Sequence, residues 1–134
     1  MTQTQSAETV VRRFYEALGR GDVATVVGLL APGVVWTEAE RFPYYDGAFH
    51  GPQAVVDKVF VRLATEWDSF GAAAHQFLAQ DDQVVAFGIY TGRFKASGRD
   101  LSAPFAHHWT VANGQIARFT MYTDTAKVLE AVAA

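Results

Sequence analysis

The chain has 134 residues, half of them hydrophobic and 19% charged, which predicts one globular domain over residues 1–134 with a single core. Its formal net charge of -3 argues against a nucleic-acid partner, which would need a basic surface, and against electrostatic binding to an acidic membrane. The absence of cysteine excludes disulfides, thiolate metal sites and thiol nucleophiles.

Two features of the sequence predict a cytoplasmic location. No apolar run approaches the roughly 18 residues that a membrane-spanning helix needs. The first segment, MTQTQSAETVVRRF, also lacks the basic start and apolar stretch of a secretory signal. A cytoplasmic protein that does not enter the membrane is therefore expected.

Two short helices are predicted at the start of the chain. Ser6 can cap the first helix, in which apolar residues recur at helical spacing over 7–18. Asp22 can cap the second helix, which Pro32-Gly33 stops. Because a tight glycine-rich turn joins them, the two segments predict a helical hairpin.

A strand, a loop and a third helix follow. The β-rich residues 34–38 predict a short strand, and the segment 41–51, with one proline, two glycines and four aromatics, predicts a loop. Pro52 opens a helix over 53–63. In this position the loop could act as a lid over a pocket or pack against the helices, and the sequence leaves both open.

From residue 70 onward the hydrophobic period changes from 3.6 to 2. Strands are predicted over 70–79, 84–95, 101–111 and 115–123, the last two joined by the hairpin turn Asn113-Gly114. Asp124 caps a short C-terminal helix. Antiparallel strands gathered after helices predict the α+β class, and a long twisted sheet curled around helices makes a cone whose mouth is a natural ligand site.

Two polar residues lie on otherwise apolar strand faces. Glu38 shares a face with Val34 and Trp36, so it lies either at the solvent end of the strand or in a pocket, where desolvation would raise its pKa and suit it to acid–base work. His107 lies on the more apolar face of its strand, while His108 lies on the other. His107 could donate a hydrogen bond, act as a base, or be a core or interface histidine.

No metal site or cofactor is expected. The four histidines show no metal-binding spacing. Gly19 and Gly21 follow a helix and not a strand, so the dinucleotide-binding pattern is not met, and no nucleophile-elbow motif is present.

Three segments together resemble the SnoaL-like branch of the NTF2-like superfamily, to which the ketosteroid isomerases also belong. They are VRRFYEALGRGDVATVVGLLAPGVVWTE, YDGAFHGPQAVVDKVF and HHWTVANGQIARFTMYTD. The resemblance implies an NTF2-like cone, a curved, mostly antiparallel sheet wrapped around three helices with an internal pocket. The family includes isomerases, cyclases, epoxide hydrolases, dehydratases and domains without chemistry, so the fold does not fix the activity.

The resemblance also implies roles for individual residues. In the ketosteroid isomerases an Asp at the place of Glu38 is the base, and a protonated Asp at the place of His107 hydrogen-bonds the developing oxyanion. The isomerases carry at the place of Phe14 a tyrosine that completes the oxyanion hole, and Phe cannot donate this bond. Tyr15 is no automatic substitute, since adjacent helical residues are about 100° apart. This departure argues against ketosteroid isomerase activity.

The leading hypothesis is a protein that binds a small, largely hydrophobic molecule, with cofactor-free acid–base catalysis of the isomerase, hydratase or dehydratase type by Glu38 and His107. The alternative is a non-catalytic binding or dimerisation module of the same fold. We expect a homodimer through the sheet, because the long strands carry apolar residues on both faces, and dimerisation is compatible with either hypothesis. The residues expected to bind the substrate are Phe14, Tyr15, Trp36, Tyr44, Tyr45, Phe60, Trp109 and Tyr122, with Tyr44 or Tyr45 able to supply the missing hydroxyl.

Overall fold

The computed structural model describes residues 6–133, so the first five residues of the N-terminal segment and Ala134, all within the predicted domain, lie outside the described residues. Across the described range six strands form one sheet in the order β2-β1-β6-β5-β4-β3. The elements in chain order are α1 (Ala7–Gly19), α2 (Val23–Gly28), β1 (Leu30–Thr37), β2 (Ala48–His50), α3 (Pro52–Val55), the π-helical turn η1 (Val56–Phe60), α4 (Val61–Glu66), β3 (Trp67–Gln80), β4 (Gln83–Phe94), β5 (Arg99–Ala112), β6 (Gln115–Thr123) and α5 (Thr125–Val132).

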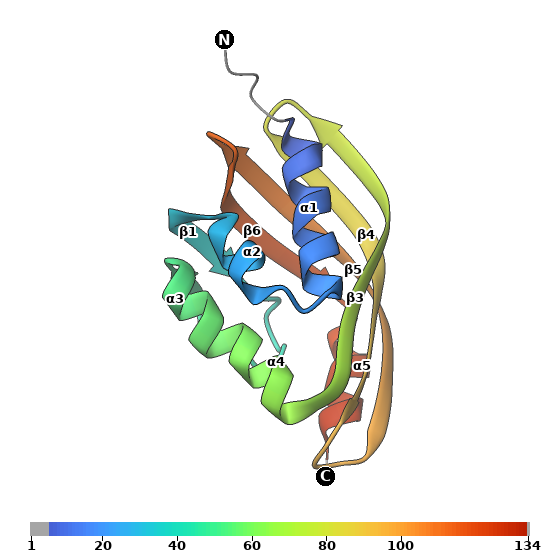
Figure 1. Ribbon diagram of the computed structural model, residues 1–134. Helices are drawn as coiled ribbons and strands as arrows, with labels where there is room; N and C mark the ends of the chain where they lie inside the picture. Colours follow the sequence, from blue (N-terminus) through green and yellow to red (C-terminus); the bar gives the residue numbers. More distant parts are fainter. Residues whose placement is uncertain (1–5, 134) are drawn as a thin grey trace.

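The sheet is curved, mixed and open. Figure 1 shows its long strands curving around α1, with α2, α3 and α4 on the same side of the sheet. The pairs β3–β4, β4–β5, β5–β6 and β1–β2 are antiparallel, while β1 and β6 are parallel. The predicted α+β cone with a mostly antiparallel sheet is therefore confirmed.

Side-chain caps and one tight turn set several of the predicted boundaries. The Ser6 hydroxyl accepts a hydrogen bond from the Thr9 N–H at 3.1 Å, and Asp22 and Asp124 cap α2 and α5 in the same way. Asn113 and Gly114 have φ values of 54° and 75°, as the predicted hairpin turn requires.

The structure differs from the predicted elements around β1. The predicted stop of the second helix at Pro32-Gly33 is wrong, because α2 already ends at Gly28 and β1 begins at Leu30. Pro32 and Gly33 lie within β1, in an irregular stretch between the Leu30 and Val35 pairings. The predicted loop contains the three-residue strand β2, which pairs with β1. The third helix continues to Glu66 through the single π-helical turn η1.

The concave face of the sheet forms the core together with α1. Alternate residues of β5 from Leu101 to Val111 are all buried, as their apolar pattern predicts. Val10, Val11 and Phe14 form the buried stripe of α1 that packs against this face. His107 therefore lies in the centre of an apolar layer.

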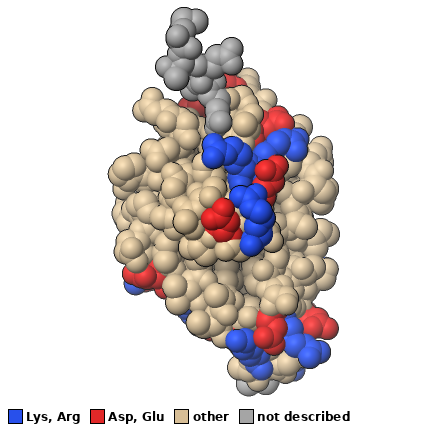
Figure 2. Space-filling model, in the orientation of Figure 1, with Lys and Arg blue, Asp and Glu red and all other residues tan. Residues whose placement is uncertain are grey.

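Charged side chains are confined to parts of the surface. Figure 2 shows both signs interleaved in a strip over α1 and clustered again near the lower end of the molecule, with a smaller charged group at the lower left edge and uncharged surface over much of this face. Within residues 6–133, no helix combines the length and apolarity that crossing a membrane requires.

Gly88 lies in β4 at a point where neighbouring groups leave no room for a side chain. A Cβ there would overlap the carbonyl oxygen of Ala73 and the Cζ atom of Phe105. Phe105 in turn stacks on the His107 imidazole, with ring centroids 4.0 Å apart. The position of the Phe105 ring therefore depends on glycine at residue 88.

We expect Gly88→Ala to lower the free energy of unfolding by about 1–3 kcal/mol, because overpacking forces the strand and the Phe105 ring to shift. Urea unfolding followed by tryptophan fluorescence measures this change. Gly33→Ala is the matched control, since a Cβ at Gly33 has no atom within 4 Å. Equal stabilities of the two variants would contradict the packing argument.

Candidate functional site

A cavity of about 350 Å³ lies between the concave face of the sheet, α1 and the η1–α4 segment. Its walls are mostly aromatic and aliphatic side chains, and the described residues that add polar groups come from α1, the α1–α2 turn, the end of β1, and strands β3 to β5. These polar residues are Tyr15, Asp22, Glu38, Ser69, Tyr90 and His107. The volume lies within the range of small-molecule sites.

The structure brings together seven of the ten predicted site residues. Both predicted catalytic residues and five of the eight predicted binding residues line the cavity. They are Glu38, His107, Phe14, Tyr15, Trp36, Phe60 and Trp109.

Three predicted binding residues lie elsewhere. Tyr44 is buried outside the lining, where its hydroxyl donates to Glu66 at 2.9 Å and accepts from the Trp67 indole at 3.1 Å. Tyr45 is exposed and does not line the cavity. The predicted loop therefore forms part of a packed wall, to which Phe42 and not a loop tyrosine contributes the lining side chain.

The prediction that Tyr122 faces the concave side is wrong, because a β-bulge reverses the alternation of β6. Ile116 faces the core, and unbroken alternation would turn Tyr122 inward as well. The register shift between Thr110 and Val111 inserts a residue into β6, so that Met121 lines the cavity and Tyr122 is 58% exposed on the outer face.

Sequence reasoning missed several lining residues, of which Trp67 and Tyr90 contribute the largest groups. Tyr90 had a usable signal, because it alternates with Val84 and Ala86, and all three are buried on the concave face. Trp67 had none, since it lies at the first position of β3, in a segment not predicted as strand.

Glu38 is a buried carboxyl in this apolar cavity. It follows β1 directly, is 3% exposed, and lies on the same face as Trp36, as alternation predicts. Desolvation raises its pKa to about 8, and the nearby Trp36 indole N–H offsets part of this rise. The Trp36 N–H is itself buried without completing a hydrogen bond. Near neutral pH the carboxyl is mostly protonated and can exchange its proton.

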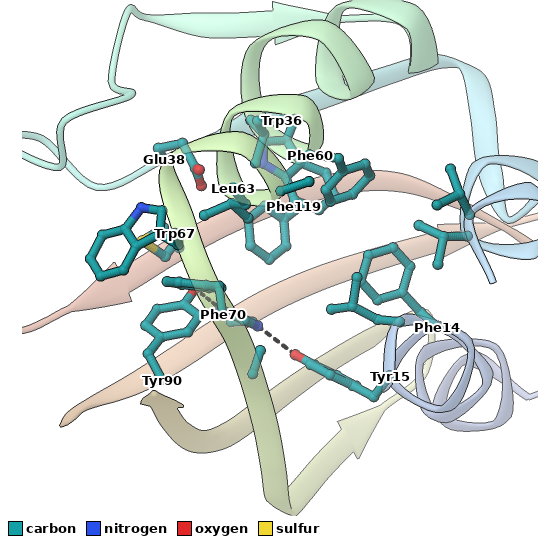
Figure 3. A pocket seen from close by; sticks show the side chains of 18 of the residues that line it. Phe14, Tyr15, Trp36, Glu38, Phe60, Leu63, Trp67, Phe70, Tyr90 and Phe119 are labelled. Carbon is teal, nitrogen blue, oxygen red and sulfur yellow. Dashed lines mark hydrogen bonds between the residues drawn. The ribbon is translucent and has the colours of Figure 1, made fainter. Parts of the chain in front are cut away.

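His107 is held between two tyrosine hydroxyls. Its Nδ1 lies 2.5 Å from the Tyr15 hydroxyl and its Nε2 lies 2.5 Å from the Tyr90 hydroxyl. Burial lowers the pKa of His107 well below its usual value, so the imidazole is neutral. Figure 3 shows these two bonds as dashed lines, with the Glu38 carboxyl turned toward the same hollow and Phe14 and Phe60 on the side of the cavity opposite Tyr90 and Trp67.

The site offers no clustered metal ligands. Across residues 6–133, no three or more His, Asp or Glu side chains gather in a way that could hold a metal ion. The chemistry available to the polar side chains of the cavity is hydrogen bonding and proton transfer.

Glu38 and His107 make stability depend on pH in opposite directions. Between its unfolded pKa of 4.5 and its folded pKa of about 8, Glu38 keeps a proton in the folded state that the unfolded state releases, so stability falls as pH rises. The lowered pKa of His107 makes stability fall as pH drops below 6.5. From pH 4.5 to 6.5 the two slopes oppose each other, and above 6.5 only that of Glu38 is left.

We expect the free energy of unfolding to fall by about 2 kcal/mol between pH 6.5 and pH 8, at roughly 1.4 kcal/mol per pH unit. Glu38→Gln should remove this fall, because it removes the titrating carboxyl. Urea unfolding of both proteins at the two pH values measures the difference. A fall of the same size in the variant would assign the effect to another group.

Comparisons with known proteins agree with this architecture. The structure is similar to that of an NTF2-like protein from Burkholderia thailandensis E264, with 31% identity, a TM-score of 0.93, and 97% of this chain and 99% of that chain covered. An NTF2-like protein from Burkholderia pseudomallei K96243 is 26% identical, with a TM-score of 0.87 and the same coverage, 97% and 99%. TerC, co-crystallised with polyporic acid, shares the fold at 21% identity, with a TM-score of 0.84 and 96% and 98% covered.

No curated protein matches the sequence. The family of SnoaL-like domains matches residues 11–119, which include Glu38, His107 and most of the cavity wall. This match covers more than half of the chain and confirms the resemblance seen in the three sequence segments. The chain therefore belongs to the SnoaL-like family and has the NTF2-like fold.

Proposed function

We propose that the chain binds a small, largely apolar molecule that carries an oxygen acceptor, and that Glu38 transfers a proton on that molecule. The observation that carries this proposal is the buried Glu38 carboxyl in a cavity lined mainly by aromatic and aliphatic groups. Such a carboxyl lowers stability when it ionises, so proton-transfer chemistry explains its position better than packing does.

The ligand class follows from the cavity. Its apolar walls favour an apolar molecule, and its few polar groups favour one with a single oxygen-bearing end. TerC, which has the same fold, was co-crystallised with polyporic acid, so a small organic molecule is compatible with this fold in another protein.

Glu38 can support two related reactions. The ionised carboxylate removes a proton from a carbon next to a carbonyl group, and the electron pair moves to the carbonyl oxygen. In a β,γ-unsaturated substrate the carboxyl then returns the proton at the γ-carbon, which is an isomerisation. In a β-hydroxy substrate the electron pair returns from the oxygen and breaks the bond to the β-hydroxyl, which takes the proton from the Glu38 carboxyl and leaves as water, which is a dehydration. Because its pKa is raised to about 8, Glu38 holds and releases this proton close to neutral pH.

Non-catalytic binding is the second candidate function. The observation that favours it is that both ring nitrogens of His107 already contact protein hydroxyls. An imidazole held in this way has no free nitrogen with which to exchange a proton with a ligand, so Glu38 would have to act without it.

Deuterium exchange distinguishes the two functions without knowledge of the natural substrate. We expect the protein to accelerate exchange into the methyl group of 2-acetonaphthone in D2O, followed by NMR. The rate should rise with pH and level off above about 8, because ionised Glu38 is the base. Glu38→Gln should lower the rate by at least about 100-fold.

Glu130→Gln is the matched control, since it makes the same change at an exposed residue outside the cavity, and it should leave the rate unchanged. Binding of the ketone without accelerated exchange would favour the non-catalytic function. Equal exchange in wild type and Glu38→Gln would remove Glu38 from the mechanism.

We also propose that the chain forms a homodimer through an outer-face patch of the sheet. The patch follows cross-strand pairs through β3 to β6, and its core is formed by Leu78, Val85, Phe87, Ile89, Ala106 and Tyr122. The direct cross-strand partners of these six residues include no Lys, Arg, Asp or Glu, and the charged residues Arg118, Arg93 and Asp100 lie in pairs farther along the strands. A second copy related by two-fold symmetry would therefore meet an apolar surface without like-charge repulsion.

We expect wild type to be dimeric at micromolar concentration and Ile89→Lys to be monomeric, because the change places a charge in the patch at a residue that is 39% exposed. Light scattering coupled to size-exclusion chromatography measures the mass. Val61→Lys, on α4 and 47% exposed, is the control and should stay dimeric. A monomeric wild type would contradict the proposal.

A further inference from the structure

A continuous chain of hydrogen bonds crosses the site from α1 to β4. The Trp109 indole N–H donates to the Tyr15 hydroxyl at 3.0 Å, and this hydroxyl lies 2.5 Å from His107 Nδ1. On the other side of the ring, Nε2 lies 2.5 Å from the Tyr90 hydroxyl. Trp109, His107 and Tyr90 are all buried, so water does not compete freely for these bonds.

The number of available hydrogens allows two arrangements of donors and acceptors in this series of hydrogen bonds. A neutral imidazole carries one N–H, so one ring nitrogen donates and the other accepts. In the first arrangement Tyr15 donates to Nδ1, and Nε2–H donates to Tyr90. In the second, Nδ1–H donates to Tyr15, and Tyr90 donates to Nε2. Each arrangement leaves one tyrosine hydroxyl with a hydrogen that makes no bond within this series of hydrogen bonds.

The surroundings of the two tyrosines favour the first arrangement. Both tyrosines line the cavity, but they lie at different ends of it. In the second arrangement the unused hydrogen belongs to Tyr15, whose ring packs against Phe14, Phe77 and Phe105. In the first it belongs to Tyr90, which lies on the side of Glu38 and Trp67 (Figure 3) and within the electrostatic influence of the Glu38 carboxyl.

We propose, resting on the proposed function, that the Tyr90 hydroxyl is the group that donates a hydrogen bond to the ligand oxygen. His107 and Tyr15 are then positioning residues, which act through Tyr90 and not on the ligand. Because the Tyr90 hydroxyl accepts a hydrogen bond from Nε2–H while it donates one to the ligand, the series of hydrogen bonds polarises this hydroxyl and strengthens its bond to the ligand.

A second observation points to an oxygen-bearing ligand at this end of the cavity. The Trp36 indole N–H is buried in the lining, close enough to the Glu38 carboxyl to lower its pKa, but among residues 6–133 no acceptor completes a hydrogen bond with it. A buried donor of this kind is costly unless something accepts from it. Two donors, on Trp36 and Tyr90, therefore lie on the cavity wall with Glu38, an arrangement that suits a carbonyl or enolate oxygen on an apolar molecule.

Ligand binding tests the role of Tyr90 directly. The probes are 2-acetonaphthone labelled with 13C at its carbonyl and 2-isopropylnaphthalene, which has no oxygen. We expect Tyr90→Phe to weaken binding of the ketone by about 3- to 10-fold and to leave binding of the hydrocarbon unchanged. The infrared carbonyl band of the bound ketone should move to higher frequency in this variant, because it loses a donor.

Tyr45→Phe is the matched control, since it removes the same hydroxyl from an exposed tyrosine outside the cavity and outside the outer-face patch, and it should change neither affinity nor the carbonyl band. Unchanged ketone affinity and an unchanged band in Tyr90→Phe would overturn the proposal while leaving the proposed function intact. If neither probe binds to wild type, the proposed function fails instead.

The tautomer of His107 tests the same proposal without any ligand. In 15N-labelled wild type we expect the His107 signals, assigned by their loss in His107→Gln, to show a protonated Nε2 and an unprotonated Nδ1. Tyr15→Phe should shift this tautomer, since it removes the donor to Nδ1, whereas Tyr45→Phe should not. A protonated Nδ1 in wild type would overturn the proposal, whatever the probes do.

Discussion

The desolvation of one carboxyl group is the constraint on which the site depends. Glu38 follows β1 directly and lies in a space bounded by aromatic rings, and none of the ion pairs formed within residues 6–133 includes it. An ion pair with a cation would lower the pKa of the Glu38 carboxyl, whereas its apolar surroundings raise this pKa. The cavity is thus both the place where a ligand can lie and the cause of the reactivity of Glu38 toward protons.

A series of hydrogen bonds between other polar side chains of the site connects α1 to the sheet. Tyr15 comes from α1, His107 and Trp109 from β5 and Tyr90 from β4, so the chain of bonds links a helix to two strands across an apolar layer. Each of these buried polar groups has few hydrogen-bond partners, so its hydrogen bonds form only if the side chains are held in fixed positions. Packing supports the same geometry, since the His107 ring stacks on Phe105, which in turn occupies the space that Gly88 leaves free.

Much of the fold and part of the site could be predicted, because local patterns determine them. Period-2 alternation placed Trp36 and Glu38 on one face of β1 and His107 between two core aromatics of β5, and the structure has them there. Unbroken alternation places Tyr122 on the wrong face, and the step of three residues from Ile116 to Phe119 is the trace that the bulge leaves in the apolar pattern. The pairing of Tyr15 with His107 was out of reach, because it joins residues 92 positions apart through the curvature of the sheet.

The π-helical turn between α3 and α4 gives the cavity a variable wall. Such a turn contains one residue more than the α-helical turn that it replaces, and each added residue rotates the next part of the helix by about 100°. The orientation of Leu63 and Ala64 toward the cavity is therefore set by the length of Val56–Phe60 and not only by residue identity. A relative with one residue fewer at this turn would offer its ligand different side chains from an unchanged sheet, so the fold can alter selectivity through chain length while the carboxyl stays in place.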